Sequence, residues 1–188
     1  MNLSSAKFVK SCPTKKDFLL DKRQVCFIGK SNVGKSSLIN SLCQNKKLVY
    51  VSKTPGCTKM LNFFLIEERY YLVDAPGYGY YKNGALDFEV MILDYLALST
   101  KCLRKCYILL DSRRDVSKDD LAVISMFEDR NIEYAIVFTK YDKLNQSEKA
   151  KAKKECDKYF ANHEVFFTSS EKNIGLSELR GNIALSLN

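Results

Sequence analysis

One short segment near the start of the chain constrains the fold more than any other. Residues 29–36 read G-K-S-N-V-G-K-S and match the phosphate-loop pattern G-x-x-x-x-G-K-[ST]. An apolar run at 25–28 precedes this segment, and apolar residues follow it at helical spacing, at Leu38, Ile39 and Leu42. Strand, glycine-containing loop and helix are the context in which this pattern holds phosphate groups. The segment therefore predicts that the chain binds a nucleoside triphosphate, and the alternative is a glycine turn that caps an ordinary helix.

Each position of this loop has an expected role. The backbone N–H groups and the helix N-terminus surround the phosphates, Lys35 reaches the terminal phosphates, and the Ser36 hydroxyl binds Mg²⁺. The predicted nucleotide contacts of the loop are Gly29, Lys30, Ser31, Asn32, Val33, Gly34, Lys35, Ser36 and Ser37.

The rest of the chain alternates apolar, strand-like runs with helical stretches. The runs cover residues 62–67, 70–73, 107–110, 134–138 and 165–167. Such alternation predicts an α/β fold in which helices cover both faces of a mostly parallel sheet of about six or seven strands. The connection Glu68-Arg69 is short enough only for a hairpin, so one edge strand is expected to be antiparallel.

A single domain is expected to account for residues 1–188, because no internal repeat or linker divides them. Residues 24–188 form the predicted core. Residues 1–23 form an arm that adds a strand around Phe8-Val9 to the sheet edge. Helix starts are predicted from capping residues at Ser117 with Asp120, at Asn145 with Glu148, and at Gly175.

Composition argues against several classes of protein. The seven cysteines are scattered and never spaced C-x-x-C, and the chain has one histidine, so neither a zinc site nor a disulfide framework is expected. No apolar stretch approaches the roughly 20 residues of a membrane helix. Residues 1–10 lack the apolar block of a secretory signal. We expect no membrane partner and a cytoplasmic location, or a plastid or mitochondrion if a transit peptide has been removed.

The charge of the chain is strongly positive. Thirty Lys and Arg against 22 Asp and Glu give a net charge of +8, which favours a polyanionic partner such as RNA. Exposed helix faces that are merely solvated are the alternative. The candidate RNA contacts are Lys7, Lys10, Lys15 and Lys16, Arg113 and Arg114, and Lys149, Lys151, Lys153, Lys154 and Lys158.

A second acidic group must help to hold Mg²⁺. Asp74 follows the apolar run Tyr71-Leu72-Val73 and opens the sequence D-A-P-G. Its carboxylate can reach the water shell of the metal, and the Gly77 N–H can meet the γ-phosphate. A structural cap is the alternative for an aspartate at a strand end.

The segment Thr139-Lys140-Tyr141-Asp142 predicts that the bound base is guanine rather than adenine. The Asp142 carboxylate can accept two hydrogen bonds, from the guanine N1–H and from the exocyclic amine, and the Lys140 stem can lie along the ring. Backbone N–H groups of Thr168, Ser169 and Ser170 are expected to meet the guanine O6. A strand that ends in a helix cap is the alternative. An ATP-using kinase or ATPase is less favoured, because this segment would then lack a purpose.

A switch threonine should complete the Mg²⁺ shell. The segment Thr54-Pro55-Gly56-Cys57-Thr58 has suitable composition, and Thr58 is favoured as the ligand. Gly56 and Cys57 are predicted nucleotide contacts beside it. An ordinary surface loop is the alternative. The predicted catalytic groups are Lys35, Thr58 and Gly77.

Five segments together resemble one family of proteins. These are residues 29–40, 52–58, 61–64, 72–80 with its G-Y-G-Y run, and 139–143. They resemble the EngB (YihA/YsxC) family of ribosome-assembly GTPases, in the TrmE-Era-EngA-EngB-Septin-like class. The resemblance implies a Ras-like fold, hydrolysis of GTP to GDP with Mg²⁺, a monomer, and a role in maturation of the large ribosomal subunit with a link to septation.

Two residues bear on the rate of hydrolysis. Ras-type enzymes have Gln directly after D-x-x-G, whereas this chain has Tyr78, so slow intrinsic turnover is predicted. Asn32 resembles the asparagine that binds K⁺ in related GTPases, with a loop-stabilising hydrogen bond as the alternative.

In contrast with the usual family pattern, Cys57 and Lys59 flank Thr58, so the contacts of this segment are expected to differ. A second class of function stays open, namely a GTP-dependent interaction switch for a protein or membrane partner with negligible hydrolysis.

Overall fold

The computed structural model describes residues 1–50, 60–79 and 85–188, except the side chains of residues 85–88. Within them, seven strands form one sheet in the order β1-β3-β4-β2-β5-β6-β7. The strands are β1 (Lys7–Cys12), β2 (Arg23–Lys30), β3 (Leu61–Ile66), β4 (Tyr70–Tyr78), β5 (Leu103–Asp111), β6 (Tyr134–Thr139) and β7 (Val165–Phe167). The α-helices are α1 (Lys35–Leu42), α2 (Ala85–Leu98), α3 (Lys118–Glu128), α4 (Gln146–Phe160) and α5 (Leu176–Leu187), and short 3-10 turns lie at Leu3–Ser5, Lys15–Asp17 and Tyr141–Lys143.

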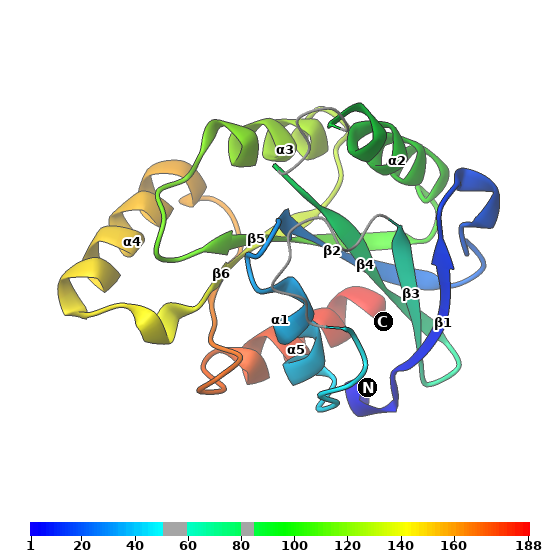
Figure 1. The fold of residues 1–188 in the computed structure, drawn as a ribbon, viewed down its shortest axis with the longest axis horizontal. Helices are drawn as coiled ribbons and strands as arrows, with labels where there is room; N and C mark the ends of the chain where they lie inside the picture. The colour runs from blue at the N-terminus through cyan, green and yellow to red at the C-terminus, as the bar shows by residue number, and fades with distance from the viewer. Residues whose placement is uncertain (51–59, 80–84) are drawn as a thin grey trace.

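Helices cover both faces of the sheet. Helices α2, α3 and α4 pack on one face, and α1 and α5 pack on the other (Figure 1). Strand β2 contributes to both layers, because Cys26 and Ile28 point into the first core and Val25 and Phe27 into the second. A strand that is buried on both faces explains the continuous apolar run at 25–28. The predicted α/β fold is confirmed.

Strand β3 runs against its neighbours. It pairs antiparallel with both β1 and β4, whereas β4, β2, β5, β6 and β7 pair parallel in turn. The sequence predicted this antiparallel strand, but it lies second from the edge, because β1 of the N-terminal arm covers it. Strand β1 has four exposed residues in a row, and its register shifts between Phe8 and Lys10.

The predicted helix starts hold. Ser117 and Asp120 form a reciprocal capping box at α3, and Asn145 and Glu148 form another at α4. Helix α5 begins directly after Gly175, which has a left-handed φ of +67°. Side-chain capping therefore sets the starts of α3 and α4, whereas the left-handed backbone of Gly175 marks the start of α5.

In the described parts of the chain, no helix is long and apolar enough to cross a bilayer. The cysteines in those parts are free thiols, at Cys12, Cys26, Cys43, Cys102, Cys106 and Cys156.

Candidate nucleotide-binding site

The phosphate loop runs from the end of β2 into α1 in the predicted order. Gly29 and Lys30 are the last residues of β2, and α1 begins at Lys35 directly after Gly34. Inside the loop, the Val33 N–H donates to the Lys30 carbonyl at 3.0 Å. The loop is a compact turn that ends on a helix N-terminus, so it can present backbone N–H groups to phosphates.

Lys35 and Asp74 form a buried ion pair behind this loop. Their side chains are 7% and 0% exposed. The Oδ1 atom of Asp74 accepts from the Lys35 ammonium, whereas Oδ2 is buried and has no hydrogen-bond partner among the described residues. A buried carboxylate oxygen without a partner is costly, so this atom is suited to accept a hydrogen bond from a ligand. A water in the shell of a bound Mg²⁺ would fit it, and the Ser36 hydroxyl in the first turn of α1 would then be a direct ligand of the ion.

The D-x-x-G segment lies directly against the phosphate loop. Strand β4 does not end before Asp74, as the sequence suggested, but continues to Tyr78, because its last residues pair with the end of β2. The Ser31 N–H donates to the Tyr78 carbonyl at 3.0 Å. A side chain on Gly77 would collide with Ser31, whose Oγ lies 2.9 Å from the Cβ position. The close approach of the two backbones therefore requires glycine here.

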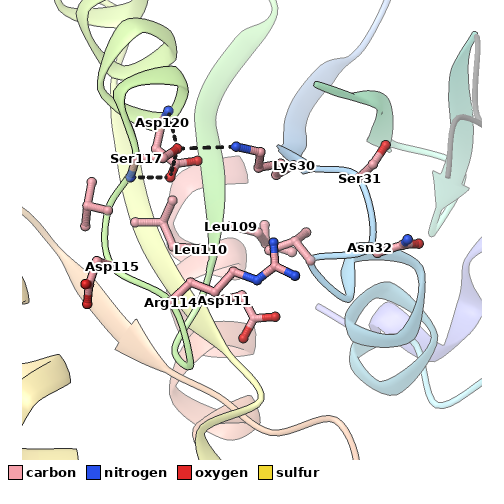
Figure 2. A pocket seen from close by; sticks show the side chains of 12 residues that line it. Lys30, Ser31, Asn32, Leu109, Leu110, Asp111, Arg114, Asp115, Ser117 and Asp120 are labelled. Atoms are coloured by element: carbon pink, nitrogen blue, oxygen red, sulfur yellow. Dashed lines mark hydrogen bonds between the residues drawn. The ribbon is translucent and has the colours of Figure 1, made fainter. Parts of the chain in front are cut away.

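The Tyr78 side chain is directed at α3. Its hydroxyl donates to Asp120 at 2.8 Å, and Asp120 also accepts from the Ser117 N–H at 2.8 Å. Burial raises the pKa of the Tyr78 phenol, and Asp120 adds to this shift, so the hydroxyl stays protonated as a donor. Figure 2 shows Lys30 of the loop reaching Ser117 at the same helix start, at 3.5 Å. The Tyr78 hydroxyl is thus engaged by Asp120 at the start of α3.

Thr139 and Lys140 tie the predicted base-recognition segment to the phosphate loop. The Thr139 hydroxyl donates to the Val33 carbonyl at 2.6 Å, and the Lys140 ammonium donates to the Asn32 carbonyl at 2.7 Å. The Lys140 stem passes over Gly34, where its Cε lies 3.5 Å from the Cβ position. The base and phosphate segments therefore form one connected unit.

A hollow of about 450 Å³ opens beside these residues, a volume typical of ligand pockets. Asp142 lies in its wall. Burial would raise the pKa of the Asp142 carboxyl, but hydrogen bonds from Ser169 and Lys143 outweigh it and hold the pKa below its ordinary value. An ionised carboxylate here can accept both guanine donors. The lining residues are Gly34, Ser37, Asn40, Ser41, Lys46, Thr139, Lys140, Asp142, Lys143, Ser170 and Glu171.

The expectation for the loop after β7 needs correction at two positions. The Thr168 N–H donates to the Phe138 carbonyl at 2.7 Å, and the Ser169 N–H donates to the Ile174 carbonyl at 3.0 Å. Both groups are committed inside the fold, and both residues are fully buried. Thr168 and Ser169 therefore do not offer free N–H groups to guanine, and of the three predicted residues only Ser170 lines the hollow.

The predicted switch segment lies outside the described residues. Gly56, Cys57 and Thr58 thus stay sequence predictions, as do the roles of Lys35 and Gly77 in catalysis.

Two site residues were missed by the sequence reasoning. The Asn40 side chain fixes the segment that follows α1. It donates to the Val49 carbonyl at 2.9 Å and accepts from the Val49 N–H at 2.8 Å. No spacing rule signals this contact. Asp111 accepts from Lys140 at 2.9 Å. Its place at the carboxyl end of β5, beside Thr139, was the available signal.

The phosphate loop, the adjoining D-x-x-G segment and the base-recognition segment on this sheet define a P-loop GTPase. Residues 24–140 match the family described as "50S ribosome-binding GTPase". A protein of Fusobacterium nucleatum named "Probable GTP-binding protein EngB" is 42% identical over 186 residues, and the match covers 95% of each chain. The chain therefore belongs to the EngB family of GTP-binding proteins, and it is a GTP-hydrolysing enzyme.

Solved structures share the fold. A crystal structure of a probable GTP-binding protein EngB has a TM-score of 0.65 and 19% identity, and the match covers 87% of this chain and 98% of that one. A crystal structure of Era in complex with MgGDPNP and part of 16S ribosomal RNA has a TM-score of 0.69 and 23% identity, covering 90% of this chain and 58% of Era.

Proposed function

We propose that this GTPase is a switch in the assembly of the large ribosomal subunit and that it acts in the cytoplasm, or in an organelle that has ribosomes. The observation that carries the proposal is the pairing of β4 with the phosphate loop, which continues through Tyr78 and Asp120 to the start of α3. A change at the phosphates can reach a surface helix by this route. Such a linked element is what a nucleotide switch requires.

A ribosomal partner is supported by the description of the matched family and by the RNA bound to Era. The net charge of +8 suits a polyanion. The arm lysines are partly neutralised, because Lys10 pairs with Asp17 at 2.7 Å and Lys15 pairs with Asp94 at 3.4 Å. Lys153 and Lys154 on α4 are exposed and have no acidic partner within 4.0 Å in the described chain. The α4 surface is thus the favoured RNA contact.

The residues of the site divide the work of hydrolysis among them. Bound Mg²⁺ would neutralise charge on the β- and γ-phosphates. Ser36 and Asp74 would hold it, together with Thr58. Lys35 would exchange its pairing with Asp74 for the terminal phosphates, and the Gly77 N–H would meet the γ-phosphate. Chain groups therefore supply positioning and charge rather than covalent chemistry.

The position of Tyr78 supports slow intrinsic turnover, because its hydroxyl is engaged by Asp120 and does not orient a water. The Asn32 side chain, in the phosphate loop, is the proposed K⁺ ligand. Single-turnover hydrolysis in K⁺ and Na⁺ buffers tests both ideas. A fast rate without any partner would contradict the first, and equal rates in the two buffers would contradict the second.

Sedimentation with ribosomal subunits tests the switch itself. We expect the chain to travel with large-subunit particles in a non-hydrolysable GTP analogue and to be released in GDP, with weaker association at high salt. Charge reversal at Lys153 and Lys154 should reduce this association, whereas reversal at Lys7 and Lys10 serves as a matched control. Association that ignores the bound nucleotide would contradict a switch. Turnover that stays negligible with particles present would favour a non-hydrolysing interaction switch.

A further inference from the structure

Asp111, the last residue of β5, lies between two cations. It pairs in register with Thr139 of β6, so it neighbours Lys140. Its side chain is 8% exposed, and its Oδ2 accepts from the Lys140 ammonium at 2.9 Å. On the other side, Arg113 donates to both carboxylate oxygens, at 2.9 Å and 2.8 Å. Figure 2 shows Asp111 on the β5 side of a small pocket, across from Ser31 and Asn32 of the phosphate loop.

This arrangement keeps Asp111 charged. Burial alone would raise the pKa of its carboxyl, but the hydrogen bonds from Arg113 and Lys140 outweigh burial and lower the pKa to about 2. At neutral pH the carboxylate is therefore a fixed negative charge at the edge of the nucleotide site.

Lys140 binds Asp111 through a long and flexible type of side chain. A lysine stem has many rotamers, and fixing it costs conformational entropy. Its ammonium is held between the Asp111 carboxylate and the Asn32 carbonyl, at 2.9 Å and 2.7 Å. Those two contacts extend the Lys140 stem across Gly34, along the wall of the hollow of about 450 Å³ that contains Asp142, which we call the base pocket.

We propose that Asp111 is a positioning residue for guanine-nucleotide binding. It anchors the Lys140 ammonium against the phosphate loop, so that the Lys140 stem is already in place when the base enters. Arg113 orients the Asp111 carboxylate from outside. This inference concerns the affinity for nucleotide and stands whether or not the chain acts on ribosomes.

The variant Asp111→Asn tests the proposal, because it keeps the shape of the side chain and removes its charge. Titration with a fluorescent GDP should show a dissociation constant about tenfold higher or more, as expected for losing a hydrogen bond between charged groups. The affinity for GTP should fall by the same factor, since GTP carries the same base as GDP. The single-turnover rate of GTP already bound should change less than about threefold, because the Asp111 carboxylate contacts Lys140 and Arg113 rather than the residues proposed to hold the phosphates.

Two further variants separate charge from position. Asp111→Glu keeps the charge and should recover most of the affinity. Asp115→Asn removes a carboxylate from the loop that follows Asp111, where an exposed pair joins Asp115 to Lys151 at 2.6 Å, and should leave the dissociation constant unchanged. Equal losses in D111N and D111E, or a comparable loss in D115N, would overturn the proposal.

A double-mutant cycle shows whether Asp111 acts through Lys140. In a K140M background, D111N should not weaken GDP binding further. Additive losses would assign Asp111 a general structural role and overturn the inference, as would a D111N dissociation constant within twofold of the unmutated chain. If D111N does not fold, R113Q replaces it in the same cycle, because the Arg113 side chain is 45% exposed. A loss of affinity in R113Q that disappears in K140M supports the proposal, and no loss overturns it.

Discussion

Alanine at Gly175 tests how tightly the loop beside the base pocket is packed. Gly175 has a left-handed φ of +67°, and a Cβ there would lie 2.2 Å from the Phe167 carbonyl oxygen. The left-handed backbone costs alanine roughly 1–2 kcal/mol. Relieving the clash must move the end of β7, and such overpacking costs roughly 1–3 kcal/mol more. We therefore expect Gly175→Ala to lower the free energy of unfolding by about 2–5 kcal/mol.

Gly181 provides the matched control, because it lies inside α5, the helix that begins directly after Gly175. It is exposed, and a Cβ there would meet nothing within 4 Å. Gly181→Ala should raise the free energy of unfolding by about 0.5–1 kcal/mol, because glycine is the poorer helix former. For a chain of this size, each kcal/mol shifts the melting temperature by about 2–4 °C, so the two variants should melt on opposite sides of the unmutated chain.

The same pair of variants links stability to nucleotide binding. Phe167 precedes the loop that contains Ser170, which lines the hollow. G175A should therefore also raise the dissociation constant for GDP, whereas G181A should not. Urea unfolding followed by circular dichroism, together with a GDP titration, gives both quantities. If the unfolding free energies of the two variants lie within about 0.5 kcal/mol of each other, the tight contact at Gly175 does not exist.

Three other predictions follow from buried polar groups. Tyr78→Phe removes the hydroxyl that donates to Asp120 and should cost about 1.5–3 kcal/mol of unfolding free energy in urea, so an unchanged midpoint would contradict that bond. Asp74→Asn leaves the Lys35 ammonium buried without a counter-charge and should cost about 3–5 kcal/mol of unfolding free energy without nucleotide. Asp17→Asn, which breaks the solvent-accessible pair of Lys10 and Asp17, should cost much less, because water and salt screen that pair. Equal losses at these two aspartates would argue against burial of the first. The pKa of Asp111 is lowered from 3.8 to about 2 in the folded chain, so the ionised Asp111 carboxylate stabilises the folded state above about pH 4. As the pH falls toward 2, this contribution to the free energy of unfolding is lost, by at most about 2 kcal/mol. Between pH 5 and pH 3 the unmutated chain should therefore lose more stability than D111N, and parallel urea curves would refute this.

Features that depend on neighbouring residues could be predicted from the sequence. The phosphate loop, the capping boxes at Ser117 and Asn145, and the hairpin around Glu68 are each written in a few adjacent positions, and the structure has them all.

Features that depend on distant partners could not. Strand β4 extends past Asp74 only because the end of β2 pairs with it. The Thr168 N–H donates to the Phe138 carbonyl, and the Asp111 carboxylate accepts from Lys140. Each contact joins segments that are far apart in the sequence. A single sequence gives the residue types at strand ends, but the pairing across the sheet decides which groups stay free to bind a ligand.

The N-terminal arm has a consequence for any shortened version of this protein. Strand β1 presents exposed lysines at Lys7 and Lys10 and a register shift, features that keep a sheet edge from joining another molecule. Beneath it, β3 is largely apolar. Removing residues 1–23 would turn β3 into an open, apolar edge strand. The arm therefore acts as a built-in guard against self-association, and a core cut at residue 24 should aggregate even though every nucleotide-binding segment remains in it.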